Sequence, residues 1–140
     1  MIHQRTFDVS TKGRGLIDVT SEVAKIVAAS KVRVGTCALF LRHTSASLVI
    51  QENADPSVLR DLQRWIDWLA PERPPFGAWE HDAEGPDDMP AHARSVLART
   101  SEVVPVIDGA LGLGTWQAIY LWEHRTAPHR RQVVVTVGGD

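Results

Sequence analysis

The order of the predicted elements favours an α+β fold, in which a mixed, mostly antiparallel sheet packs with two or three helices. Predicted strands gather at both ends of the chain and predicted helices lie between them, which is typical of α+β rather than doubly wound domains. The length of 140 residues fits one compact domain spanning residues 1–140. A chain of this size buries roughly 68–70% of its unfolded surface, so a core needs neither disulfides nor a structural metal.

The first part of the chain is expected to hold a hairpin and a helix. Apolar and polar residues alternate imperfectly over Ile2–Val9, the segment Gly13–Gly15 turns the chain, and Leu16–Val19 is again extended. This pattern predicts a β-hairpin. Thr20 or Ser21 can cap a helix that follows over roughly 22–29. Its buried stripe comes from residues three and four apart: Val23, Ile26 and Val27.

Two strands and a longer helix are expected next. Val32–Leu41 and Ser47–Gln51 are rich in β-branched and other apolar residues, so each predicts a strand. Asp55 can accept hydrogen bonds from free helix amides, and Pro56 suits the first helical position. Apolar residues then follow at helical spacing: Val58, Leu59, Leu62, Trp65, Ile66 and Leu69. Prolines from Pro71 onward end this helix.

The last part of the chain predicts one short helix and three strands. Pro90 starts a helix that runs through Leu97. Glu102–Ile107, Thr115–Trp122 and Arg131–Val137 follow as strands. Asp108-Gly109 predicts a turn between the first two of these strands.

Composition excludes several classes of function. Fifteen Lys and Arg against 17 Asp and Glu give a net charge of −2 without a long basic run, so nonspecific nucleic-acid binding is not expected. The N-terminal residues lack the apolar region of a signal peptide, and no apolar run approaches the ~20 residues of a membrane helix. Cys37 is the only cysteine, so no intrachain disulfide can form. We expect a cytoplasmic protein with no nucleic-acid or membrane partner.

The segment Glu80–His92 carries the most distinctive polar pattern. It combines His81 and His92 with five carboxylates and offers almost no apolar surface for burial. It is either a solvated connector, as polar loops with Gly and Pro often are, or a segment that a polar ligand orders. The candidate ligands are a metal ion and a cationic or phosphorylated molecule.

A third histidine, His43, ends a predicted central strand and is followed by Thr, Ser, Ala and Ser. Polar residues at the rim of a core often build sites, although Ser and Thr also cap ordinary turns. Imidazole and carboxylate together suit zinc or another divalent ion such as magnesium. We therefore predict a three-histidine metal site of His43, His81 and His92, with a fourth position left for water or substrate and Glu84 orienting the ligands.

Other polar residues are candidates for catalysis or substrate binding. Glu52 and Asn53 follow the second predicted strand and lack a structural explanation, so Glu52 is a catalytic candidate and Asn53 a binding candidate. Ser45 is a binding candidate and not a nucleophile, because no Gly-x-Ser-x-Gly elbow is present. Arg125 and Arg131 belong to a basic segment that either recognises phosphate or carboxylate or is solvated surface.

Several motifs stand in the order and spacing of one known family: His43-Thr-Ser-Ala-Ser-Leu48, Glu52-Asn-x-Asp-Pro56 with Asp61, His81-Asp-x-Glu-Gly85, Asp87-Asp-Met-Pro-Ala-His92, Gly114-Thr-Trp-Gln117 and Glu123-His-Arg125. The chain resembles the YjbQ family, also called the secondary thiamine-phosphate synthase family, over nearly its whole length. The resemblance implies an α+β homotrimer with a site near the subunit boundary. That site would contain the three histidines, with Glu52, Asn53 and Asp55 close by and Arg131 as the favoured anion contact. The chain departs from the family pattern at Pro86–Asp88, so no ligand role is predicted for Asp87 or Asp88.

Three functions follow. The family activity would join hydroxymethylpyrimidine diphosphate to thiazole phosphate and release pyrophosphate, with a metal and arginines stabilising the leaving group. The second is a metal-dependent hydrolase of a small phosphate ester, in which a water activated by the ion is the nucleophile. The third is a trimeric module that binds a metal or a phosphorylated ligand without turnover, with Trp68 and Trp79 at its interface or pocket wall.

Overall fold

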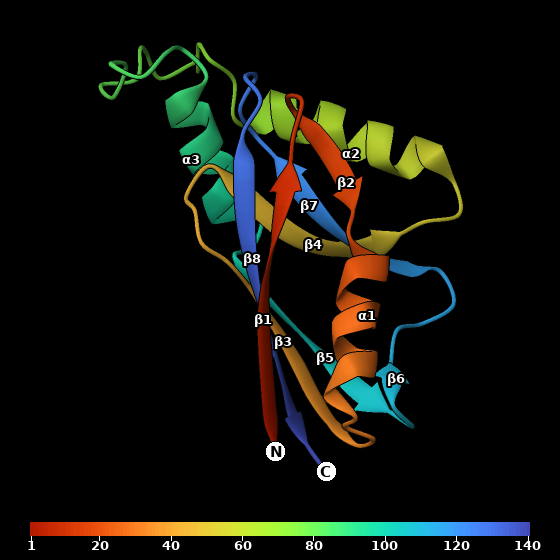
Figure 1. Ribbon diagram of the computed structural model, residues 1–140. Coiled ribbons are helices and arrows are strands. Elements are labelled where there is room, and N and C mark those ends of the chain that lie inside the picture. The colour runs from red at the N-terminus through yellow and green to blue at the C-terminus, as the bar shows by residue number, and fades with distance from the viewer.

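A computed structural model describes residues 1–140 and contains two antiparallel sheets and three helices (Figure 1). One sheet has the strand order β1-β8-β3-β5-β6 and the other β2-β7-β4. The elements are β1 (Ile2–Ser10), β2 (Gly15–Asp18), α1 (Thr20–Ser30), β3 (Gly35–Leu41), β4 (Ala46–Glu52), α2 (Pro56–Leu69), α3 (Asp88–Leu97), β5 (Ser101–Ile107), β6 (Ala110–Leu111), β7 (Gln117–Glu123) and β8 (Arg130–Gly139). The predicted α+β class is confirmed, and every strand pair is antiparallel.

The predicted N-terminal hairpin is wrong, because β1 and β2 belong to different sheets. β1 pairs with β8 along its whole length, from Ile2 opposite Gly138 to Ser10 opposite Arg130. The four-residue β2 pairs with β7 instead. A local hairpin would pair four residues at most, whereas β8 offers β1 nine partners, so the distant strand is the better hydrogen-bonding partner.

The main core is formed by α1 and residues of both sheets, and α1 lies alongside the strands (Figure 1). Val133, Val135 and Val137 alternate inward along β8 and are fully buried. Val23 and Val27 of the predicted helical stripe are buried against them. The predicted cap differs: the Asp18 carboxylate accepts the Thr20 amide at 2.9 Å, while the Thr20 hydroxyl accepts the amide of Ile119 at 2.8 Å.

Helix α2 begins as predicted but buries less of its apolar stripe than expected. The Asp55 carboxylate accepts the Ser57 amide at 2.9 Å, and Pro56 opens the helix. Ile66 is its only fully buried residue, while Trp65 and Trp68 are 50% and 76% exposed. A mostly apolar cavity of about 230 Å³ lies beneath the helix, lined by Leu62, Ile66 and Trp122 among others.

Asp108 and Gly109 do form a turn, with positive φ at both residues (51° and 83°), as a type I′ hairpin turn requires. The turn leads from β5 to β6, a two-residue strand that the sequence did not predict, and not directly to β7. Strand β7 runs in the smaller sheet, where Glu123 pairs with Ala46 at the start of β4. This register brings the ends of β4 and β7 together and positions the polar residues described below. No helix is both long and apolar enough to span a membrane.

Candidate functional site

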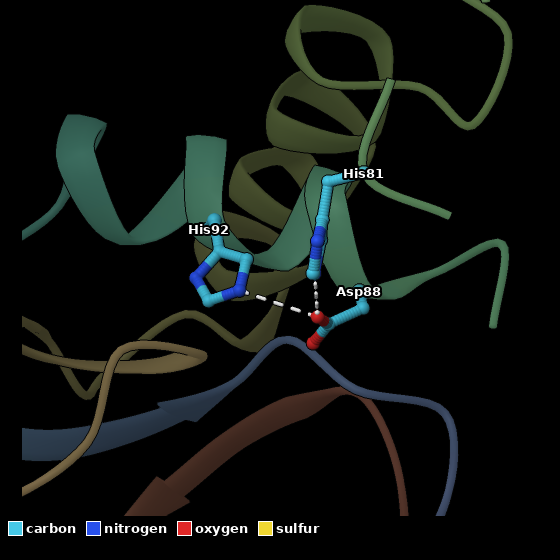
Figure 2. A group of neighbouring side chains, drawn as sticks. All are labelled: His81, Asp88 and His92. Carbon is cyan, nitrogen blue, oxygen red and sulfur yellow. Dashed lines mark hydrogen bonds and ion pairs between the residues drawn. The ribbon is translucent and has the colours of Figure 1, made fainter. Parts of the chain in front are cut away.

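At the start of α3, two histidines face one carboxylate, and together they make three potential metal ligands (Figure 2). Asp88 opens the helix and His92 lies one turn later on the same face, while His81 comes from the preceding loop. His81 Nε2 lies 2.7 Å and His92 Nε2 3.2 Å from the same oxygen, Asp88 Oδ2. We call His81, Asp88 and His92 the rim cluster.

The hydrogen bond of His92 to Thr44 determines whether the nitrogen that faces Asp88 carries a proton. His92 Nδ1 lies 3.1 Å from the carbonyl oxygen of Thr44, which can only accept, so Nδ1 carries the proton. In the neutral ring Nε2 is then unprotonated, and its lone pair faces the Asp88 oxygen. Two electron-rich atoms at this separation repel unless a cation, either a proton or a metal ion, lies between them.

Arg125 holds the other side of Asp88. Its Nη1 donates to Asp88 Oδ1 at 2.7 Å, its Nε to Asp87 Oδ2 at 2.9 Å, and its Nη2 to the Glu84 carbonyl at 2.9 Å. Burial raises the pKa of Asp87, but hydrogen bonds from Thr126 and Arg125 outweigh it and lower that pKa to about 2. Burial also opposes ionisation of Asp88, yet hydrogen bonds and the Arg125 charge hold its pKa below the ordinary value. Both carboxylates are therefore ionised at neutral pH.

A second polar group, the inner cluster of Thr11, Ser45, Glu123 and Arg131, lies beneath the rim. The buried Glu123 carboxylate accepts hydrogen bonds from Arg131 and, at 2.7 Å, from the Thr11 hydroxyl. Burial raises the pKa of Glu123, but these bonds reverse the effect and keep the pKa below its ordinary value. Arg131 Nη2 also donates to Ser45 Oγ at 3.0 Å. Glu123 and Arg131 thus form a buried, hydrogen-bonded ion pair.

The structure brings His81 and His92 together, and the third potential ligand beside them is Asp88 rather than His43. His43 lies next to this group, since its neighbour Thr44 bonds His92, but its Nδ1 is in contact with Ser45. Sequence reasoning gave Asp88 no ligand role. The Asp88-x-x-x-His92 spacing at a helix start was the signal that could have revealed it.

The two arginines are placed differently. Arg125 binds the carboxylates of the rim, so its guanidinium orients Asp87 and Asp88. Arg131, favoured from sequence as an anion contact, is 1% exposed and faces Glu123 and Ser45. Ser45 is likewise fully buried.

Glu52 and Asn53 lie at the opposite end of β4 from Ser45. The strand Ala46–Glu52 spans roughly 20 Å, so within one chain these residues are remote from the histidines. The Glu52 carboxylate accepts a hydrogen bond from the backbone amide of Asp55 at 3.3 Å. The backbone amide of Asn53 donates to the Trp116 carbonyl at 2.8 Å.

His124, between Glu123 and Arg125 in sequence, is buried and its imidazole contacts Ser47 Oγ at 2.8 Å through Nε2. Its Nδ1 has no protein partner. Burial, aided by the positive charge of Arg94, lowers the pKa of His124 to about 3, so the ring is neutral at physiological pH.

Comparisons with known proteins agree over nearly the whole chain. Residues 5–140 match the family model described as UPF0047 protein YjbQ-like. The chain is 50% identical over 138 residues to UPF0047 protein sll1880 of Synechocystis, covering 99% of this chain and 92% of that protein. It is 42% identical over 141 residues to UPF0047 protein YjbQ of Escherichia coli O157:H7, covering both chains fully.

A solved structure from Clostridium acetobutylicum, described as an uncharacterized conserved protein of the YjbQ/UPF0047 family, has the same fold. It superposes with a TM-score of 0.87 at 35% identity and covers 96% of this chain and 99% of that one. Sequence and structure therefore agree that this chain belongs to the YjbQ/UPF0047 family.

Proposed function

We propose that the protein is a divalent-metal-dependent enzyme acting on a phosphorylated small molecule, with the ion held by the rim cluster. The observation that carries this proposal is the approach of two imidazole Nε2 atoms to one carboxylate oxygen, Asp88 Oδ2. His92 Nε2 carries no proton in the neutral ring, so a cation is the simplest partner between it and Asp88 Oδ2.

The donor set fits a metal. His92 Nδ1 donates to a backbone carbonyl, which is the usual outer contact of a metal-binding histidine and leaves Nε2 as the ligand atom. Arg125 engages Asp88 Oδ1 and leaves Oδ2 free for an ion. Two imidazoles with one carboxylate favour zinc or another transition metal over magnesium, which prefers oxygen ligands alone.

A divalent ion bound here would supply positive charge to a phosphoryl oxygen. The chain itself supplies the rest of the site. Arg125 orients Asp88, and the contact with the Thr44 carbonyl orients His92. The Glu84 carboxylate lies 3.7 Å from His81 Nε2, beside the same ligand. The rim histidines are 43% and 32% exposed, so a small molecule can reach them.

The family resemblance favours one reaction, the joining of hydroxymethylpyrimidine diphosphate to thiazole phosphate with release of pyrophosphate. A cationic site suits a leaving pyrophosphate. A hydrolase of a small phosphate ester is the alternative, because three protein ligands leave coordination positions open. Product analysis separates the two: a joined product with pyrophosphate supports the first, and a singly hydrolysed substrate the second. Ligand binding without turnover over a broad panel would favour a binding module.

The test of the metal site is the metal content of untagged protein, compared with a His81/Asp88/His92 triple alanine variant. We expect close to one divalent ion per chain after zinc loading, and none in the triple variant. Asp82→Asn, in the same loop but outside the cluster, is the matched control and should retain the ion. Equal metal content in wild type and triple variant would overturn the proposal.

We further propose that the protein acts as a homotrimer in the cytoplasm. Large apolar side chains are exposed on several elements: Phe40, Trp65, Trp68, Val103 and Ile107. In a trimer, Glu52 and Asn53 would reach the histidines of a neighbouring copy, which their distance within one chain does not allow. Mixing inactive Asn53→Ala and His92→Ala proteins should then restore part of the activity. A monomeric mass at micromolar concentration would contradict the trimer.

A further inference from the structure

The contacts of the His43 imidazole assign the position of its proton. Its Nδ1 lies 3.2 Å from the backbone nitrogen of Ser45 and 3.0 Å from Ser45 Oγ. A backbone N–H can only donate, so Nδ1 is the acceptor and carries no proton. In the neutral ring the proton is therefore on Nε2.

The inner cluster fixes the direction of the second contact. Arg131 Nη2 donates to Ser45 Oγ at 3.0 Å, and a guanidinium has no acceptor atom, so the hydroxyl oxygen accepts there. Its own hydrogen is then free to point to His43 Nδ1. Glu123 holds Arg131 in place through two hydrogen bonds. Donation therefore runs one way, from Arg131 through Ser45 to His43.

We propose that Ser45 and Arg131 are positioning residues that hold His43 with its proton on Nε2, so that His43 donates a hydrogen bond to an anionic oxygen of the substrate. This assignment rests on the proposed function for the nature of the substrate, a phosphate ester or diphosphate, which would lie between His43 and the rim cluster. In this state His43 offers no lone pair at Nε2 and is neither a metal ligand nor a general base.

The position of His43 supports this role. The residue is exposed, and the adjacent Thr44 carbonyl contacts His92, so Nε2–H is accessible beside the rim cluster. Burial lowers the pKa of His43, and the charges of Arg131 and His129 lower it further. The ring therefore stays neutral at physiological pH. A neutral Nε2–H still donates, and hydrogen bonds to charged groups are among the stronger ones in proteins.

The first test reads the protonation pattern directly, by two-bond proton–nitrogen correlation spectra of the ¹⁵N-labelled full chain, with His43 assigned by its loss in His43→Gln. We expect the pattern of an unprotonated Nδ1 and a protonated Nε2. Ser45→Ala removes the hydroxyl but keeps the backbone N–H, so it should shift these nitrogen signals only part of the way toward the averaged values of a free imidazole. Ser47→Ala, which removes a buried hydroxyl two residues along that contacts His124 instead, should leave them unchanged. A protonated Nδ1 would overturn the assignment of the tautomer, and signals that Ser45→Ala does not move would overturn the positioning role of the Ser45 hydroxyl.

The second test separates ligand from donor, with zinc titrated calorimetrically into the metal-free chain. His43→Ala and His43→Gln should both bind zinc within about twofold of wild type, since loss of a ligand would cost far more. Sulfate, which does not precipitate with zinc, then serves as the phosphoryl probe. His43→Ala should weaken sulfate binding by about tenfold. His43→Gln, whose side-chain amide places an N–H near the Nε2 position, should restore most of it.

If wild type binds zinc and both His43 variants do not, His43 is a ligand and the inference is overturned. Sulfate affinity unchanged in His43→Ala, with zinc bound, would also overturn it. Absence of zinc binding in every protein, wild type included, would instead refute the proposed metal site. In that case the spectra still decide the state of His43, so the two failures are distinguishable.

Discussion

The inner cluster and the rim cluster are each built around one carboxylate, Glu123 and Asp88 respectively, but differ in how completely that carboxylate's partners match it. In the inner cluster, the Glu123 carboxylate accepts from Thr11, Arg131 and two backbone amides, so the charge is fully compensated. In the rim cluster, Asp88 Oδ2 faces His81 Nε2 at 2.7 Å and also His92 Nε2 at 3.2 Å, which carries a lone pair in the neutral ring. Only residue 124 separates Glu123 from Arg125, so the end of β7 serves both clusters. The inner cluster therefore needs no additional partner, whereas a proton or, under the proposed function, a metal ion lies between His92 and Asp88.

The largest expected effect tests whether the inner cluster is structural. Arg131→Met leaves the fully buried Glu123 charge unpaired and should lower the free energy of unfolding by about 3–5 kcal/mol. Urea denaturation at pH 7 measures the loss. The double variant Glu123→Gln/Arg131→Met removes both charges and should be markedly more stable than Arg131→Met alone. Equal losses in the two would show that the ion pair is not what stabilises this region.

The next effect concerns His124, which follows Glu123 of the inner cluster in the chain. Its pKa is lowered to about 3 in the folded chain from 6.5, so the unfolded chain binds more protons between these values. The free energy of unfolding should therefore fall, by up to a few kcal/mol, as the pH drops from about 6.5 toward 3. Arg94 and Arg131 face the ring and oppose its protonation, while Glu123 favours it.

His124→Gln keeps a group that can bond Ser47 but does not titrate, so its stability should depend less on pH over this range. Urea denaturation at several pH values gives the slope for each protein. Identical slopes for wild type and variant would place the acid sensitivity elsewhere in the chain.

The third effect separates the clusters by their response to metal. Zinc at 100 times its Kd should stabilise the wild-type chain by about 2.7 kcal/mol, because only the folded chain holds the site together. Asp88→Asn should lose this stabilisation, while Arg131→Met, though less stable, should keep it. Thermal unfolding with and without zinc measures both. An equal gain in Asp88→Asn and wild type would contradict the distinction between the clusters.

Sequence reasoning predicted what depends on local pattern. The Asp55-Pro56 helix start, the Val23/Val27 stripe and the Asp108-Gly109 turn each follow from residues close in the chain. The pairing of β1 with β8 did not, because it joins residues more than 100 positions apart. Exposure of Trp65 was also unpredictable from helical spacing, which identifies an apolar face but not what covers it.

The candidate site shows the same limit. His81 and His92 were predicted as ligands because acidic residues surround them in the sequence. Their shared partner, Asp88, could be identified only from the positions of the loop and α3 in the structure. Arg131 illustrates the converse. Its sequence neighbours suggested an exposed basic segment, whereas the period-two alternation of β8 points it inward with Val133 and Val135.

The smallest effect tests how far the rim depends on its second layer. Asp87 Oδ2 accepts from Arg125 Nε and the Thr126 amide, both at 2.9 Å, and so orients the guanidinium that holds Asp88. Asp87→Asn keeps the shape but removes the charge, and should cost roughly 1 kcal/mol of stability, because part of this carboxylate is screened by solvent. Zinc affinity should fall by less than the ~10-fold or more typical of a direct outer partner of a ligand, because Asp87 acts only through Arg125. Calorimetric zinc titration of Asp87→Asn and Asp88→Asn compares the two residues. If both variants lose zinc equally, Asp87 belongs to the metal site itself and the rim cluster includes it.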